Sequence, residues 1–264
     1  MERRVLITGG SRGIGAGIAE AAARRGWTNL LVSRNESAMR GLVERWRQAG
    51  AGPEHRYLPL DLAAPDALRR LTGWLDEVGY PDTVIHNAAV GFFGPFPQTD
   101  LSGHEDTIAL GVRMTVELTH ALLPRLSKTP NSYLALVGST SGRKPVPFMT
   151  VYSSTKAFIH SFAFALREEL RGGAPKVLLA IPGAVQTDFP RLAGLPAAFA
   201  AKGLDPAEVG ETIVQAIDDG KDGALPIGSF KERHGGFIQR ILPPAFWARR
   251  MRQSYERMLP HTAR

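Results

Sequence analysis

The stretch VYSSTKAF, residues 151–158, contains a tyrosine and a lysine whose types and spacing suit proton transfer. Tyr152 and Lys156 are four residues apart, so on a helix they lie on the same side, one turn apart. An ammonium beside a phenol favours the phenolate and lowers a pKa that is ordinarily ~10. The same spacing also occurs on ordinary helix surfaces, so this pair by itself leaves both readings open.

A glycine-rich segment near the start of the chain has the composition of a phosphate-binding turn. TGGSRGIG, residues 8–15, follows a short apolar run and precedes a helical pattern. Glycines at positions 9, 13 and 15 permit a tight turn and let backbone N–H groups approach a pyrophosphate at the helix N-terminus. A glycine-rich surface turn is the alternative, but the place between a first strand and a first helix favours cofactor binding.

Short apolar runs alternate with amphipathic stretches along the chain, and these elements must position both motifs. The expected strands cover residues 4–9, 29–34, 54–60, 82–87, 132–138, 176–182 and 223–228. The expected helices cover residues 14–25, 36–49, 65–78, 102–126, 151–171 and 206–219. Strands that are apolar on both sides, each followed by a helix, indicate a parallel sheet covered on both faces. The expected fold class is α/β, a doubly wound (Rossmann), mainly parallel seven-stranded sheet with helices on both faces and ligands beyond the carboxyl ends of its strands.

The composition limits the available chemistry. A chain of 264 residues fits one large domain, and we expect residues 1–264 to form a single dinucleotide-binding and catalytic domain. Cysteine is absent, which excludes disulfides and thiolate nucleophiles, and the seven histidines lack metal-ligand spacing, so we expect no metal site. The N-terminus enters an apolar strand at once and no window is long enough to span a membrane, so we expect a cytoplasmic protein.

With these motifs in place, the chain resembles the short-chain dehydrogenase/reductase family from Val5 to about Ile227. Residues 8–15 have that family's Thr-Gly-x-x-x-Gly-x-Gly spacing, and residues 152–156 have its Tyr-x-x-x-Lys spacing. Four further elements follow in the family's order: DL at 61–62, NAAV at 87–90, GSTSG at 138–142 and PGAVQTDF at 182–189. All of them in order at the right spacing make the resemblance specific.

The resemblance implies a role for each matching residue. Ser139, thirteen positions before Tyr152, would bind the substrate oxygen in an oxyanion role. Tyr152 would be the general acid in ketone reduction or the base in alcohol oxidation, and Lys156 would lower its pKa and hold the nicotinamide ribose. The implied cofactor-binding residues are Gly9, Ser11, Arg12, Gly13, Ile14, Gly15, Arg34, Asp61, Leu62, Asn87, Ala88, Ala89, Tyr152, Lys156, Pro182, Gly183, Val185 and Thr187.

Two arginines favour NADP(H) as the cofactor. Arg34 follows the second strand, where an NAD-dependent protein carries an acidic residue, and Arg12 lies inside the glycine loop. A guanidinium matches the geometry of a 2′-phosphate, and the net charge of +7 is compatible with an anionic partner. Solvated arginines are the alternative, but the nearest acidic residue, Glu36, lies further into the turn.

One position departs from the family pattern. Gly111 stands where the family usually carries an asparagine that helps to hold a water behind the lysine. Glycine offers no side-chain hydrogen bond and weakens a helix interior by about 0.5–1 kcal/mol relative to alanine. One interpretation, which we favour, is that a water or a backbone carbonyl completes the proton relay in place of the asparagine. The other is that the enzyme is slow or altered.

The expected substrate region is apolar. Phe92, Phe93 and Phe189 are candidate substrate-binding residues, and residues 189–204 are a candidate lid, although core packing of the phenylalanines is an equal alternative.

Residues 230–264 are expected to form a helical C-terminal extension. In it an apolar stripe and a basic set recur at helical spacing: Trp247, Met251, Tyr255 and Met258, against Arg249, Arg250, Arg252 and Arg257. The extension could pack within the protein, cover the substrate site, bind a second subunit or lie on an anionic membrane, packing being the commoner outcome.

The sequence therefore predicts an NADP(H)-dependent oxidoreductase that interconverts a carbonyl and a secondary alcohol on a hydrophobic small molecule. The alternative is a dinucleotide-binding sensor or scaffold protein with weak or no turnover, for which Gly111 is the only hint. The resemblance also implies a homodimer or homotetramer through the two long helices. Nothing in the chain resembles a nucleic-acid-binding module, so no nucleic-acid partner is expected.

Overall fold

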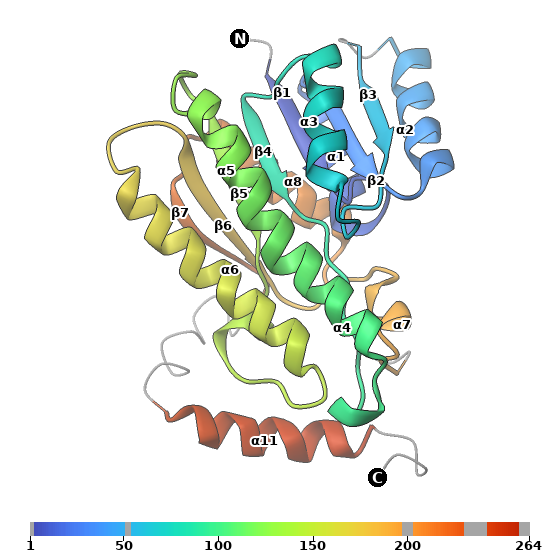
Figure 1. Ribbon diagram of the computed structural model, residues 1–264, viewed down its shortest axis with the longest axis vertical. Helices are drawn as coiled ribbons and strands as arrows, with labels where there is room; N and C mark the ends of the chain where they lie inside the picture. Colours follow the sequence, from blue (N-terminus) through green and yellow to red (C-terminus); the bar gives the residue numbers. More distant parts are fainter. Residues whose placement is uncertain (1–2, 51–53, 197–202, 230–241, 259–264) are drawn as a thin grey trace.

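The computed structural model describes residues 3–50, 54–196, 203–229 and 242–258. Seven parallel strands form one sheet in the order β3-β2-β1-β4-β5-β6-β7 (Figure 1). The strands are β1 (Arg4–Thr8), β2 (Thr28–Ser33), β3 (Arg56–Pro59), β4 (Thr83–His86), β5 (Tyr133–Val137), β6 (Lys176–Pro182) and β7 (Gly223–Ile227). The order reverses between β1 and β4, and this switch point is where a doubly wound sheet binds its ligand.

Helices cover both faces of the sheet. The helices are α1 (Gly13–Arg24), α2 (Glu36–Gln48), α3 (Ala67–Val78), α4 (Leu101–Ile108), α5 (Met114–Leu126), α6 (Thr150–Glu169), α7 (Phe189–Leu192), α8 (Pro206–Asp218) and α11 (Pro244–Glu256). Figure 1 shows α5 and α6 in front of the sheet and α8 behind it. The buried side chains agree, since α1, α2 and α8 share one core cluster and α3, α5 and α6 share the other.

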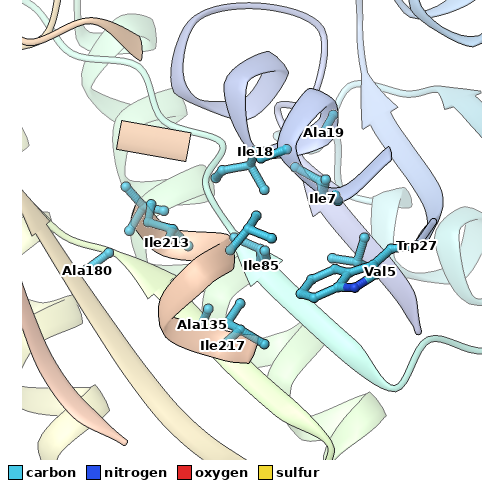
Figure 2. Close-up of a cluster of buried hydrophobic side chains, with 14 of the residues drawn as sticks. Val5, Ile7, Ile18, Ala19, Trp27, Ile85, Ala135, Ala180, Ile213 and Ile217 are labelled. Carbon is cyan, nitrogen blue, oxygen red and sulfur yellow. The ribbon is translucent and has the colours of Figure 1, made fainter. Parts of the chain in front are cut away.

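Branched apolar side chains of the central strands account for both clusters. Val5 and Ile7 alternate with Leu6 along β1, so the first two face α1 and α8 while Leu6 faces the opposite helices. Figure 2 shows the first cluster, in which Ile213 and Ile217 of α8 pack beside the sheet. Burial on both faces explains why the strands read as continuous apolar runs. The predicted doubly wound fold is confirmed.

One predicted helix differs from the structure. Residues 102–126 were expected as a single α-helix, but a π-helical turn over Ala109–Arg113 separates α4 from α5. Gly111 lies inside this turn and is buried against α6, where a Cβ would lie 2.8 Å from the Cβ of Thr155. A π turn inserts one residue into the helix, so the apolar period of 3.6 alone could not reveal it.

The C-terminal helix α11 crosses the end of the molecule beside the segment that leads into α6 (Figure 1). Its apolar stripe is half-buried, with the Trp247 indole nitrogen shielded from solvent and Tyr255 packed against Phe93. Arg249, Arg250 and Arg252 are exposed on the other side. The stripe therefore packs on the protein itself. Among the described residues, no helix has both the length and the apolar character needed to cross a membrane.

Candidate active site

The glycine loop between β1 and α1 has the geometry of a phosphate cradle. Gly9 and Gly13 have φ values of 68° and 54°, a region that side chains other than glycine rarely adopt. A Cβ on Gly15 would lie 2.1 Å from the carbonyl oxygen of Gly9, so only glycine fits. The N-cap residue Arg12 makes no side-chain cap bond, which leaves the first N–H groups of α1 available to an anion.

Asn87 and Thr8 fix this loop against the end of β4. The Thr8 hydroxyl accepts the backbone N–H groups of Asn87 at 3.0 Å and Ala88 at 3.1 Å. The Asn87 side-chain amide donates to the carbonyl oxygens of Thr8 at 2.9 Å and Gly9 at 3.2 Å. These bonds join the carboxyl ends of β1 and β4 at the switch point.

Polar side chains continue along the ends of β2 and β3. The hydroxyls of Ser11 and Ser33 are hydrogen-bonded at 2.8 Å, which links the glycine loop to β2. Arg34 lies next in the chain and its guanidinium is 3.8 Å from the Asp61 carboxylate. Leu62 is buried beside them. Arg34 and Asp61, predicted from separate motifs, therefore lie together.

The segment after β6 closes on the glycine loop from the other side. A Cβ on Gly13 would lie 3.0 Å from the methyl of Thr187, and the guanidinium of Arg12 is 3.7 Å from the carboxylate of Asp188. Val185 is buried and pairs with Leu204 in an isolated bridge. The remaining predicted cofactor residues lie at the same edge of the sheet: Ile14, Ala89, Pro182 and Gly183.

Ser139, Tyr152 and Lys156 meet beyond the carboxyl end of β5. Ser139 follows the strand after Gly138, and its hydroxyl lies close enough to the Tyr152 phenol to lower the pKa of that phenol. The Lys156 ammonium donates to the carbonyl oxygen of Val137 at 2.8 Å and lies 5.7 Å from the centroid of the Tyr152 ring. Because Tyr152 and Lys156 are on adjacent turns of α6, the helix presents both to the same edge of the sheet.

Burial controls the protonation of both α6 residues. Burial raises the pKa of Tyr152 to about 12, and the nearby Ser139 hydroxyl opposes part of that shift. Burial lowers the pKa of the Lys156 ammonium to about 8. The sequence argument expected Lys156, together with the positive charge of the oxidised nicotinamide, to favour the phenolate; in the chain alone, burial raises the pKa of the phenol. A neutral phenol suits proton donation.

An apolar cluster surrounds the Tyr152 ring. The ring of Phe189 lies 4.9 Å from it, and Phe93 lies 5.7 Å from the ring of Tyr255 in the same cluster. The buried members are Val146, Met149, Ala193 and Leu195. Phe92 lies elsewhere, because its ring packs against Gly103 of α4. The expected lid, residues 189–204, is described except for 197–202.

A family model described as short chain dehydrogenase matches residues 3–193.

The chain belongs to this family.

Relatives cover most of the chain. Ketoacyl reductase HetN of Nostoc sp. is 29% identical over 225 residues, which span 81% of this chain and 75% of that protein. A short-chain dehydrogenase from Sphingobium yanoikuyae in complex with NADPH has a TM-score of 0.80 at 28% identity, covering 90% of this chain and 94% of that one. The bulky-bulky ketone specific alcohol dehydrogenase from Comamonas testosteroni has a TM-score of 0.75 at 25% identity, covering 98% and 95%.

A short-chain dehydrogenase binds a nicotinamide dinucleotide and acts on a small-molecule carbonyl or alcohol. The residues of this chain fit such a cofactor, because the glycine loop turns tightly into α1 and the first N–H groups of that helix have no side-chain cap. The chain therefore belongs to this family of oxidoreductases by its sequence and its fold.

Sequence reasoning missed two residues beside the site. His160 accepts the backbone N–H of Ser139, and its spacing of four from Lys156 was the available signal. Tyr255 was noted in the apolar stripe of the tail, but nothing local showed which part of the protein the stripe would contact. Its contact with Phe93 joins residues more than 150 positions apart in the chain, a pairing that no sequence period carries.

Proposed function

We propose that this short-chain dehydrogenase is an NADP(H)-dependent oxidoreductase that interconverts a ketone and a secondary alcohol on a hydrophobic small molecule. The observation that carries the proposal is the meeting of Ser139, Tyr152 and Lys156 at the sheet edge that also holds the glycine loop. Hydroxyl, phenol and ammonium groups at one edge are the set needed to bind a carbonyl oxygen and supply its proton.

Each of the three residues has a role that follows from its environment. Tyr152, whose neutral form burial favours, donates its proton to the substrate oxygen during reduction. Ser139 hydrogen-bonds the same oxygen and stabilises the negative charge that develops there. Lys156 provides a positive charge near the phenol and hydrogen-bond donors for the ribose hydroxyls of the cofactor. When bound, the nicotinamide supplies or accepts the hydride.

The preference for NADP(H) rests on Arg12 and Arg34. Both guanidinium groups are more than half exposed at the rim of the glycine loop, and their ion pairs with Asp188 and Asp61 are longer than 3.6 Å. Such exposed pairs are weak, so either arginine can turn to a 2′-phosphate at little cost. NADPH in the Sphingobium relative supports the same choice.

The apolar cluster around Tyr152 supports a hydrophobic substrate. Phe189 of the lid, Phe93 after β4 and Tyr255 of α11 come from three separate segments and pack in one cluster with the catalytic phenol. Apolar walls with few polar groups are typical of sites for hydrophobic ligands. The bulky-ketone specificity of the Comamonas relative and the ketoacyl substrate class of the Nostoc relative support a ketone of that kind.

Exposed apolar side chains on α4, α5 and α6 support a homodimer or homotetramer. They are Leu101 and Ile108 on α4, Val116 on α5 and Phe164 on α6. Apolar residues grouped on adjoining helices mark a face that a second copy can cover. The apolar stripe of α11 packs inward, and Phe246 is the one large apolar side chain exposed on the described part of this helix. A single exposed phenylalanine does not form an apolar membrane-binding face, so we do not assign α11 membrane contact.

The test is NADPH oxidation by the full chain across a panel of hydrophobic ketones, beside Tyr152→Phe and the matched control Tyr80→Phe. We expect turnover in the wild type and in Tyr80→Phe, and a loss of about 10²-fold or more in Tyr152→Phe with NADPH affinity unchanged. Equal turnover in Tyr152→Phe would refute the role of the phenol. Tight NADPH binding without turnover of any ketone would favour a dinucleotide-binding sensor instead.

A further inference from the structure

His160 lies on the same side of α6 as the two residues assigned to catalysis. It follows Lys156 by four positions and Tyr152 by eight, so the three side chains stack along one helix face. The His160 ring faces the loop that leaves β5, and the backbone N–H of Ser139 donates to its Nε2 with an N···N distance of 3.4 Å. His160 is therefore in direct contact with the peptide that carries the Ser139 hydroxyl.

The loop has room for the His160 ring only because glycines flank it. A Cβ on Gly138 would lie 2.6 Å from Nε2 of His160, and a Cβ on Gly142 would lie 3.0 Å from the same atom. Both distances are shorter than an ordinary van der Waals contact. The imidazole thus fills the space between the residues before and after the Ser139 turn, and the three positions fit one another as a unit.

The charges around the ring keep it neutral. The charged groups that face His160 are Arg143, in the turn after Ser139, and Lys156 on its own helix, and both are positive. Burial, with these two charges, lowers the pKa of His160 to about 4. A neutral imidazole has one acceptor nitrogen, and because Nε2 receives the Ser139 N–H, the proton belongs on Nδ1. The ring can then act as an acceptor throughout the physiological pH range.

Ser139 needs such an anchor because its own side chain is already engaged. Its hydroxyl oxygen accepts the backbone N–H of Ser141 at 3.1 Å, and the same hydroxyl lies close enough to the Tyr152 phenol to lower the pKa of that phenol. The residue is extended, with φ −168° and ψ 154°, at the start of the 3-10 turn Thr140–Arg143. A rotation of its peptide would move the hydroxyl away from the phenol.

We propose that His160 is a positioning residue: as the Nδ1–H tautomer it holds the Ser139 peptide N–H and thereby keeps the Ser139 hydroxyl aligned with Tyr152. This inference rests on the role proposed above for Ser139. His160 touches neither the reacting atoms nor the hydride path, and it acts only through the loop that it supports.

The tautomer provides a test that needs no substrate. In the ¹⁵N-labelled full chain, a long-range ¹H–¹⁵N correlation spectrum reports the protonated nitrogen of each histidine ring, and His160→Gln assigns the signal. We expect the His160 ring to remain the neutral Nδ1–H tautomer between about pH 6 and about pH 8, where an unperturbed histidine titrates. A proton on Nε2, or a titration midpoint within that range, overturns the proposal whether or not the chain reduces any ketone.

Kinetics then separate a positioning role from a merely structural one. His160→Leu keeps much of the ring volume but removes the acceptor, whereas His160→Gln retains an acceptor, and Ser161→Gln on the exposed side of α6 is the matched control. We expect kcat for ketone reduction to fall roughly 10- to 100-fold in His160→Leu and clearly less in His160→Gln, because misplacing a catalytic group by about 1 Å costs ~10²-fold. NADPH affinity should be unchanged in all three. An unchanged kcat in His160→Leu, or equal losses in both His160 variants, overturns the proposal.

Discussion

Replacing Arg34 with alanine should weaken the binding of NADPH but not of NADH. Arg34 and its partner Asp61 are 59% and 46% exposed and their charged groups are 3.8 Å apart, so their ion pair is worth at most about 1 kcal/mol. A charge-assisted hydrogen bond to a phosphate is worth about 1.5–3 kcal/mol. Net of the pair that it replaces, the loss of Arg34 should cost roughly 0.5–3 kcal/mol, or about a 2- to 150-fold increase in the NADPH dissociation constant.

Two features of the structure sharpen this prediction. Removal of the arginine leaves the Asp61 carboxylate beside the expected phosphate, which adds repulsion and places Arg34→Ala toward the upper end of that range. The matched control is Arg45→Ala, in the last turn of α2 at the opposite end of that helix from Arg34, which breaks an ion pair of similar exposure with Glu20. Fluorescence titrations of NADPH and NADH at two salt concentrations measure both affinities. An unchanged ratio of NADPH to NADH affinity in Arg34→Ala would refute the assignment of the 2′-phosphate to this residue.

Three further predictions concern Lys156, Gly111 and Tyr255. The pKa of Lys156 is lowered to about 8, so its ammonium is present below that pH and lost above it. NADPH affinity of the wild type should therefore fall as the pH rises through about 8, whereas that of Lys156→Met should not depend on pH in this range. A flat profile in the wild type would contradict this prediction. Gly111→Ala brings a Cβ to 2.8 Å from Thr155 and should destabilise the fold by about 1–3 kcal/mol, whereas Gly73→Ala, with open space around it on α3, should be neutral or stabilising in the same thermal melts. Tyr255→Ala should raise KM for large hydrophobic ketones without changing NADPH affinity, and an equal effect of Gln253→Ala on the exposed side of α11 would argue against a specific contact.

The fold was predictable because its signals are local. Each strand carries an apolar run on both faces and each crossover carries an amphipathic helix, so the doubly wound arrangement follows from periodicity and chirality. The π turn at Ala109–Arg113 was not predictable, since it depends on how closely α6 approaches Gly111. An asparagine in place of Gly111 would bring the same Cβ against Thr155. Gly111 is thus explained by packing, and its departure from the family pattern does not by itself indicate a slow enzyme.

The candidate site was predictable where backbone chemistry dictates residue type. Gly9, Gly13 and Gly15 are required by positive φ or close approach, and the sequence shows such positions directly. The sequence did not show which residues tertiary packing would bring into contact. Asp61 beside Arg34 and Tyr255 beside Phe93 join motifs from different parts of the chain, and their pairing depends on the sheet order and on the path of the C-terminal segment.

Burial also decides which protonation state of Tyr152 this chain favours by itself. In water a tyrosine and a lysine titrate at nearly the same pH, but here desolvation moves the phenol pKa up to about 12 and the ammonium pKa down to about 8. Near neutral pH the phenol is therefore protonated and ready to donate, as ketone reduction requires. Alcohol oxidation needs the phenolate, which the chain's own groups disfavour, so that direction depends on positive charge supplied from outside the chain. If an ultraviolet absorbance titration of the protein without nicotinamide showed a phenol ionising near pH 7 that is missing in Tyr152→Phe, burial could not be the dominant influence on Tyr152.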